Sequence, residues 1–378
     1  MIKWFFKYGA VFFLLNTILL SVKQTVVIGE FVFLGVMGVF SFLVLINPPQ
    51  IKNIIFHKSF RFFLILNGLN IFYFILFHNI NDFEAAKYLI ARGFQFSLIS
   101  FSIYHNYEYF KARFFKHLIY SIFGVVVFGL IVNPFIFSGR YSGIIWNPNM
   151  LSSFTCIAFS ALFLGVKKKT KFELLLLWLF LIISLATGSR GVLVAVSLAF
   201  IFKYGLSIWN MVYALLALSI YFMLLNLNLD TSVNRFASQG ILNDRLLQLQ
   251  YAYETILQKP FFGSGLDKYA YINPELIPYY LSGHIISAHN SFLAIFVQYG
   301  FIFGFFIIGI IFYQTIRFYL KIDKDDPAEL FYFYIIIYAI LASVYENLIT
   351  GINEFHTILF WFSFGFLSYS IYRRENGN

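Results

Sequence analysis

The sequence predicts an all-α polytopic membrane protein, and three observations support this fold class. Of the 378 residues, 60% are hydrophobic and only 12% are charged, with a mean hydropathy of +0.77, whereas an average soluble domain has about 25% charged residues. The apolar residues form long runs, and about 20 such residues cross the roughly 30 Å of a bilayer's hydrocarbon. The basic residues behind the net charge of +10 lie mostly between these runs. This pattern is typical of membrane topology, so we expect no nucleic-acid partner.

The apolar runs predict about twelve transmembrane helices in one integral membrane domain, residues 1–378. They cover residues 5–22, 26–46, 60–78, 84–104, 117–137, 149–166, 172–187, 190–203, 206–226, 289–316, 330–350 and 355–372. The first run follows Lys3 and Lys7 but has no small-residue cleavage site after it, so we expect a retained helix. Residues 227–288 form the one long polar segment, a large loop between helices 9 and 10.

The loop charges decide whether residues 172–203 cross the membrane once or twice. Thr187-Gly188-Ser189-Arg190-Gly191 is the only interruption in this apolar run. Two spans place most Lys and Arg residues on one face, whereas one span divides them almost evenly. Because cytoplasmic loops carry an excess of basic residues, we predict two short spans, with both termini in the cytoplasm and the 227–288 loop on the outer face.

Three features have simple structural interpretations. The lysine run 167–171 is expected to fix topology, with a lipid-headgroup contact as the alternative. Asp323-Lys-Asp-Asp326 is followed by Pro327, which is typical of a helix start, and a metal site there is less favoured. The single Cys156 lies in an apolar run, so it forms no internal disulfide and completes no metal site alone.

Four arginines on or near the predicted outer face indicate a polar chamber that opens outward. Arg92 lies about two turns inside a helix, Arg140 precedes Tyr-Ser-Gly143, Arg190 separates two short helices, and Arg245 belongs to a predicted amphipathic helix, residues 243–254. A charge at membrane depth costs at least about 2.5 kcal/mol, so it normally faces a polar cavity and has a partner. We expect this chamber to hold the functional site.

Arg190 and Arg245 are the candidate anion-binding residues. A guanidinium offers a planar fork of donors that matches phosphate, and the helix after Arg190 presents free N–H groups at its N-terminus. Together the two arginines are suited to clamp a pyrophosphate. The alternatives are that Arg190 snorkels to the interface and that Arg245 pairs with Asp244 or Asp230. The glycines of Lys259-Pro-Phe-Phe-Gly263-Ser-Gly265 are expected to form a tight turn.

His289 is the candidate proton acceptor. It begins the tenth predicted span at the outer surface, before Asn290 and Ser291, and an imidazole with a pKa near 6.5 accepts a proton at neutral pH. The alternative is a helix-capping role for this segment. His284 is the weaker candidate because it lies in a freer loop. The sequence has no Ser-His-Asp order, zinc spacing or Walker glycine loop.

Three motifs in this order resemble the O-antigen ligases and O-antigen polymerases of bacterial surface-polysaccharide assembly. They are the Gly-Ser-Arg turn at Arg190, Arg245 followed by Lys259-Pro-Phe-Phe-Gly263-Ser-Gly265, and His289-Asn-Ser-Phe-Leu followed by Gly300. Ser142-Gly-Ile-Ile-Trp-Asn147-Pro-Asn149 also resembles a family segment at the start of the sixth helix. The motifs span residues 138–316, and the twelve-helix topology with its large outer loop extends the resemblance along the chain.

The resemblance implies a metal-independent C-type glycosyltransferase in the bacterial inner membrane, with no cofactor and a periplasmic active site. The donor would be an undecaprenyl-pyrophosphate-linked oligosaccharide and the acceptor a glycan lipid, with a chain-length regulator as a possible further partner. Arg190 and Arg245 would bind the pyrophosphate leaving group, and His289 would be the general base or a residue that positions the acceptor. Attack opposite the leaving group would invert the anomeric centre. Substrate contacts are expected from Arg140, Arg92, Glu254 and Asn290. Glu254, Asp267, Glu346 and Glu354 are alternatives for orienting hydroxyls or replacing His289 as base.

Three classes of function remain open at this point: a glycan transferase, a transporter and a structural scaffold. A repeat-unit polymerase is favoured over an O-antigen ligase, which transfers to lipid A-core, because the chain is compact and its outer loop modest. A lipid-linked glycan flippase or transporter would also place arginines in a cavity, but transporters usually contain internal repeats, and no convincing repeat is present. A structural scaffold is the third possibility, in which Arg190, Arg245 and His289 would each be replaceable.

Overall fold

The computed structural model describes residues 2–46, 48–136, 139–189, 191–207, 210, 212, 243–267 and 288–377. Within these ranges the regular elements are helices, joined by loops and one isolated bridge between Val22 and Ile145. The helices are α1 (Ile2–Leu20), α2 (Val26–Ile46), α3 (Pro48–Ile55), η1 (Lys58–Phe60), α4 (Arg61–Phe77), α5 (Phe83–Ala112), α6 (Phe114–Val132), α7 (Pro148–Gly165), α8 (Lys171–Ala186), α9 (Gly191–Tyr204), α12 (Asn243–Gln258), α13 (Ser291–Lys321), α14 (Pro327–Ala342) and α15 (Phe355–Glu375).

Several of these helices are suited to cross a membrane. In the described part of the chain, five are long and apolar enough, namely 26–46, 58–77, 114–132, 148–165 and 291–321, and three shorter apolar helices cover 4–20, 191–204 and 327–342. A multi-pass membrane protein is therefore supported. The total of twelve spans stays a prediction, because the expected span 206–226 lies almost wholly outside the described residues.

Helices coincide with the other expected spans, but several boundaries differ and one span is bent. The fifth expected span, 117–137, ends at Val132. The fourth expected span continues past residue 104 to Ala112, and the eleventh ends at Ala342 instead of residue 350. The expected span 289–316 is not one straight helix, because Gly300 adopts φ 66° and ψ −176° inside α13. These dihedral angles are essentially restricted to glycine, and they bend α13 where sequence hydropathy gave no break.

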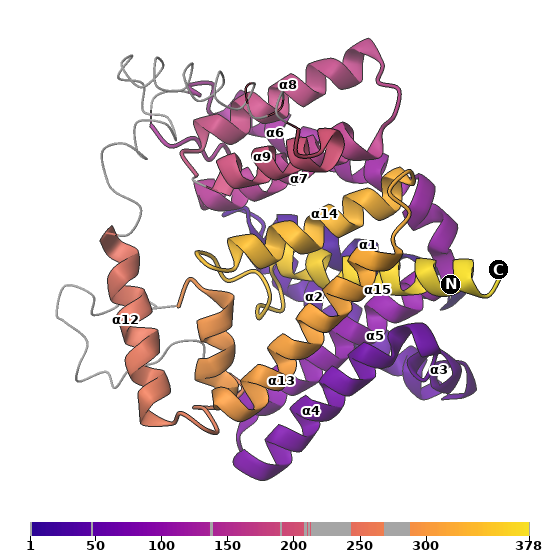
Figure 1. Cartoon of the computed structure of the whole chain (residues 1–378), viewed down its shortest axis with the longest axis vertical. Coiled ribbons are helices and arrows are strands. Elements are labelled where there is room, and N and C mark those ends of the chain that lie inside the picture. Colours follow the sequence, from indigo (N-terminus) through magenta and orange to yellow (C-terminus); the bar gives the residue numbers. More distant parts are fainter. Residues whose placement is uncertain are drawn as a thin grey trace.

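The bend at Gly300 receives the turn that follows α12. Ser264 N donates to Val297 O at 2.7 Å, and Phe301 N donates to Pro260 O at 2.7 Å. These bonds satisfy backbone groups that the interruption of the helix leaves without intrahelical partners. The first part of α13 thus lies beside α12, at the left of Figure 1, while the rest runs along α4. The predicted Lys259–Gly265 turn is confirmed, with positive φ at Gly263 and Gly265.

Local capping signals fix the helix starts. Asn147 caps α7 with Pro148 in its first turn, Thr170 and Glu173 form a capping box on α8, and Asp326 caps α14 before Pro327. Side-chain oxygens at these positions accept bonds from N–H groups that a helix leaves free. The helix start predicted at Pro327 is confirmed.

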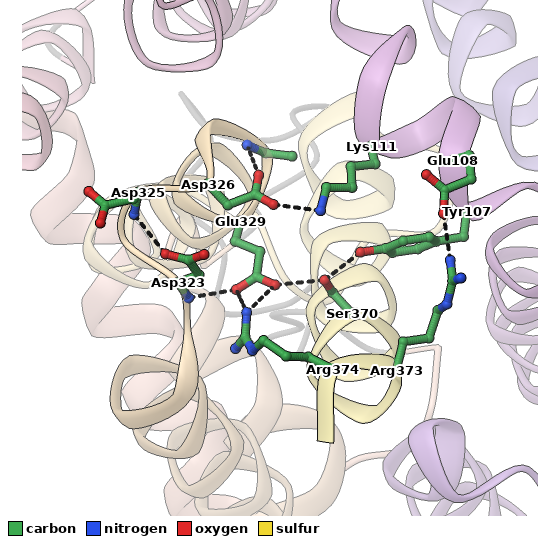
Figure 2. A network of polar contacts seen from close by, with 11 residues as sticks. Tyr107, Glu108, Lys111, Asp323, Asp325, Asp326, Glu329, Ser370, Arg373 and Arg374 are labelled. Carbon is green, nitrogen blue, oxygen red and sulfur yellow. Dashed lines mark hydrogen bonds and ion pairs between the residues drawn. The ribbon is translucent and has the colours of Figure 1, made fainter. Parts of the chain in front are cut away.

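A polar network joins α5, α14 and α15 at the end of the bundle where both chain termini lie (Figure 1, Figure 2). At its centre Glu329, only 2% exposed, accepts from Arg374 at 2.8 and 2.9 Å and from Ser370 at 2.7 Å. Asp326 pairs with Lys111 at 2.7 Å. Protein groups therefore contact the carboxylates of Asp323 and Asp326. Among the described residues, no group of three or more His, Cys, Asp or Glu side chains could hold a metal ion.

Candidate active site

The loop between α14 and α15, Ser343–Glu354, is the centre of the candidate site. Three helices hold it by its backbone. The described bonds run from Ser291 N to Ser343 O (2.9 Å), from Asn290 Nδ2 to Val344 O (2.9 Å), from Leu348 N to Ser291 Oγ (2.8 Å), from Trp361 Nε1 to Ile349 O (3.1 Å), from Arg92 to Thr350 O and from Gln95 Nε2 to Ile352 O (3.3 Å). A loop restrained at so many points presents its side chains in fixed positions.

His289 faces Glu346 of this loop. Its Nδ1 lies 3.3 Å from Glu346 Oε2, and the side chains are 38% and 25% exposed, so both are accessible to a substrate. A carboxylate at Nδ1 favours the tautomer with the proton on that atom, which leaves Nε2 as the acceptor. His289 also has φ +40°, the one positive φ of a non-glycine residue in the described part of the chain. Such strain tends to occur at functional sites.

Asn290 has a structural role next to His289. Its Oδ1 accepts from Phe292 N at 2.9 Å and from Leu293 N at 3.0 Å, so it is the N-cap of α13. The capping alternative considered for this segment is therefore carried by Asn290. The cap and the bond to Val344 O orient the backbone from which His289 projects.

Glu354 ends the loop, directly before α15. Its side chain keeps contact with solvent although protein surrounds it. This burial raises the pKa of the carboxyl from the usual 4.5 to about 7; Glu346 also raises the pKa, while Thr357, Arg92 and His289 lower it. A carboxyl with a pKa near 7 exchanges protons at physiological pH, so Glu354 is a second candidate for proton transfer.

The Gly-Ser-Arg turn approaches the same loop. Arg190 itself lies outside the described residues, but its neighbour Gly191 begins α9. A Cβ on Gly191 would lie 3.4 Å from Tyr338 Oη and 3.5 Å from Tyr345 Oη, and Tyr345 directly precedes Glu346. The structure thus brings the residue after Arg190 close to the loop that contacts His289.

Arg140 lies on the other side of the same turn. Its Nε donates to Thr187 O at 3.2 Å and its Nη2 to Asn149 Oδ1 at 2.5 Å, and its side chain is exposed. Asn149 belongs to the Trp-Asn-Pro-Asn segment at the start of α7. These contacts tie that segment to the end of α8 and place an accessible guanidinium beside residues 187–191.

Arg92 lies deeper than the other described site residues. It is 3% exposed, and it donates to Gln95 Oε1 at 2.7 Å, to Tyr88 Oη at 3.1 Å and to Thr350 O. Its described partners are therefore protein groups.

The remaining candidates belong to α12 and the turn after it. Arg245 lies in α12, but its side chain is outside the described residues. Glu254 accepts from Gln250 at 2.9 Å on the same helix, and Asp267 follows the turn that docks at Gly300. His284 lies outside the described residues. The predicted amphipathic helix is confirmed, since α12 packs against the first part of α13 (Figure 1).

The segment from α8 to α13 carries the similarity to a known family. Residues 175–309 match the family model for O-antigen ligases. This match supports the resemblance to O-antigen ligases and polymerases that the motifs predicted, and no match to a curated protein was found. It covers Arg190, Arg245, His289 and Gly300. The matched family implies O-antigen ligase or related polymerase activity, and it suggests a glycosyltransferase-like enzyme that acts on lipid-linked glycans.

The Ser343–Glu354 loop follows the matched segment and does not stand out by its sequence. Glu346 and Glu354 were considered only as alternatives to His289, and residues 343–350 were assigned to a span. The available signal was the polar run Tyr345-Glu-Asn347 after fifteen mostly apolar residues. That Glu346 contacts His289, 57 positions earlier, has no local signature.

Proposed function

We propose that this protein is a repeat-unit polymerase for O-antigen or a related surface polysaccharide. It transfers an undecaprenyl-pyrophosphate-linked glycan to a second lipid-linked repeat unit at the periplasmic face of the bacterial inner membrane. The observation that carries the proposal is the contact of His289 with Glu346 beside the start of α9, within a chain that matches the O-antigen ligase family. Polymerase is preferred over ligase because the chain is compact and its outer loop modest.

The donor side is assigned to Arg190 and Arg245. The pyrophosphate leaves with two bonding electrons and develops negative charge in the transition state, which fixed guanidinium groups stabilise without a metal. Arg140 supports this side, because it reaches the residues before Arg190 and remains exposed. Glu254 on α12 is assigned to sugar hydroxyls of the donor.

The acceptor side is assigned to His289. The acceptor hydroxyl oxygen attacks the anomeric carbon opposite the pyrophosphate, the bond from that carbon to the phosphate oxygen breaks, and the hydroxyl proton passes to His289 Nε2. Attack opposite the leaving group inverts the anomeric centre. Glu346 stabilises the imidazolium that forms, since its carboxylate faces Nδ1, and Asn290 fixes the backbone that carries the imidazole.

The first experiment compares surface glycans from cells in which the gene is deleted and then complemented. Wild type is expected to restore a ladder of chain lengths, whereas Arg190→Ala, Arg245→Ala and His289→Ala are expected to give single repeat units on the lipid core. Arg317→Ala, at the far end of α13, is the control and should restore the ladder. A full ladder from any of the three site variants would remove that residue from the mechanism.

The same experiment separates the alternatives. A ligase would leave no glycan on the lipid core, with long carrier-linked chains accumulating in the periplasm. A flippase would leave the repeat units on the cytoplasmic side. When purified protein in detergent is given lipid-linked repeat units, we expect it to join them into longer chains. A transporter would not join repeat units, and in detergent it has no second compartment to which it could move them.

A further inference from the structure

Arg92 is a buried charge in α5 whose contacts serve the loop of the candidate site. It donates to Thr350 O, 258 positions away in the sequence, while Gln95 and Tyr88 of its own helix hold the guanidinium at 2.7 and 3.1 Å. The faces of Tyr88, Phe96 and Trp361 surround it at 5.4 to 5.9 Å. Each of these interactions fixes the direction of the fork, because cation–π contacts and charged hydrogen bonds are both orientation-dependent.

The space around Arg92 is too small for the donor. The cavity that it lines with Tyr88, Tyr299, Thr350 and Trp361 has a volume of about 30 Å³. One ordered water needs roughly 10–15 Å³ of such volume, so the cavity holds about two waters. A pyrophosphate, with its two tetrahedral phosphorus centres, needs much more room. The expected role of Arg92 as a direct substrate contact thus has no supporting geometry in this arrangement.

The loop anchored by Arg92 carries both carboxylates of the site. Trp361 and Gln95 bind Ile349 O and Ile352 O, on the two sides of Thr350. Glu346 precedes this anchored stretch and faces His289, and Glu354 follows it. A shift of the anchored stretch would therefore move both carboxylates relative to the imidazole.

We propose that Arg92 is a positioning residue for the acceptor side of the site, which holds the Ser343–Glu354 loop so that Glu346 and Glu354 face the bound acceptor and His289. The proposal rests on the function proposed above. Arg92 acts in two ways. Its hydrogen bond to Thr350 O holds the loop at a fixed distance from α5. Its charge lowers the pKa of Glu354, whereas burial and Glu346 raise that pKa. Its effect on turnover reaches the substrate through these two carboxylates.

The test is a kinetic comparison of purified Arg92→Met, Arg92→Lys and Trp361→Phe with wild type. Arg92→Met is expected to lower kcat by about 10-fold to 100-fold, as a displacement of about 1 Å does, while KM for the donor changes less than about twofold. The acid limb of its pH profile should move to higher pH, because Glu354 loses a neighbouring positive charge. Trp361→Phe removes a loop bond but no charge, so kcat should fall without a shift of the limb. Arg92→Lys keeps the charge, so the acid limb of its pH profile should lie at the same pH as in wild type.

The opposite kinetic result would overturn the proposal. If Arg92→Met raises the donor KM at least about tenfold and keeps kcat at saturation, Arg92 binds the donor. An unshifted acid limb in Arg92→Met would remove the electrostatic part.

Hydrogen exchange reports the position of the loop independently of catalysis. Failure of the positioning role can therefore be told apart from failure of the polymerase proposal. Hydrogen exchange of residues 343–354 is expected to accelerate in Arg92→Met and in Trp361→Phe, whether the enzyme is assayed as a polymerase, as a ligase or is inactive. Exchange in Arg92→Met that equals wild type would exclude the positioning role. A fast-exchanging loop in a protein that lacks transferase activity would instead contradict only the proposed function. Variants that remain monodisperse after purification are compared, and Arg92→Lys keeps the test available if Arg92→Met does not fold.

Discussion

At the scale of single residues, strain and chemistry coincide at His289. A side chain in the left-handed region costs about 1–2 kcal/mol relative to the usual backbone, and asparagine and glycine tolerate this region best. Histidine is among the non-glycine residues that occur there most often, but it still carries this cost relative to glycine. The contact of its imidazole with Glu346 gives a reason for the choice.

His289 is therefore expected to show opposite effects on stability and activity. His289→Gly should keep or slightly raise the melting temperature, by up to about 1 kcal/mol of relieved strain, while abolishing glycan transfer. His289→Ala loses the same chemistry without relieving the strain, so it should be less stable than His289→Gly. Thermal unfolding in detergent and transfer of lipid-linked repeats measure the two effects. Transfer by His289→Gly at the wild-type rate would exclude the imidazole as base.

Glu354 is expected to make stability depend on pH. Burial raises its pKa in the folded protein to about 7, against 4.5 for an ordinary glutamate. The folded state therefore binds the proton more tightly than the unfolded state, and this residue's contribution to stability falls as pH rises from about 4.5 through 7. Glu346, Arg92, His289 and Thr357 face the carboxyl and set this value.

Glu354→Gln removes this titration. The melting temperature of Glu354→Gln minus that of wild type should rise as the pH increases from 4 to 8. Most of this rise should occur between pH 5 and pH 7. Parallel melting curves at each pH provide the measurement. A difference that stays constant across this range would show that Glu354 does not titrate there.

At the scale of elements, α13 interlocks with the turn after α12. A Cβ on Gly300 would lie 2.4 Å from backbone atoms of Phe261 and Phe262, and one on Gly263 would lie 2.3 Å from Gln298 O. Tyr73 Oη of α4 closes the contact by donating toward Phe262 O and Gln298 O at 2.5 and 2.7 Å. The bend holds α12, and with it Arg245, against the first part of α13.

Gly300→Ala is expected to disrupt this interlock. The backbone conformation alone costs about 1–3 kcal/mol for a non-glycine residue, and the contact with Phe261 adds to it. Gly309→Ala is the matched control, because the same helix leaves open space around that position, and alanine there should be neutral or stabilising by up to about 1 kcal/mol. Melting temperatures and protease sensitivity of α12 compare the two. Equal stability of both variants would contradict the interlock.

At the scale of the whole molecule, the two chain termini lie at the same end of the bundle (Figure 1). The network around Glu329 in Figure 2 joins α5, α14 and α15 at that end, far from His289 along α13. We expect this end to be cytoplasmic. Lys169, in the α7–α8 loop, provides a chemical test of that orientation.

Lys169 is expected to react from the cytoplasmic side. Burial and the nearby charge of Lys203 lower its pKa from 10.5 to about 8, so about half of the side chains carry a nucleophilic neutral amine at pH 8. A membrane-impermeant amine reagent should label Lys169 in inverted vesicles and leave it unlabelled in intact spheroplasts, with mass spectrometry as the readout. Lys203→Met removes the neighbouring charge, raises the pKa of Lys169 and should slow labelling. Labelling in spheroplasts would overturn the topology.

The sequence by itself determined the helices, their caps and the resemblance to a family. Apolar runs of spanning length form helices because in lipid a helix satisfies its own backbone groups. Asn147, Thr170 and Asp326 fix helix starts through bonds to the next residues. The motifs at Arg190, Lys259–Gly265 and His289 were sufficient to indicate the O-antigen ligase family. These features rest on local interactions or on the order of residues, which a sequence contains directly.

Only the tertiary structure decided which of these residues work together. Arg92 meets Thr350, His289 meets Glu346, and Gly263 meets Gly300, and each pair depends on the relative position of two helices rather than on the local sequence. The same is true of proton affinity, since Glu354 has a pKa near 7 because of the groups that the fold places around it. The outward polar chamber expected from the costly arginines stays a prediction, whereas the contact of Arg92 with the Ser343–Glu354 loop appears only in the packing.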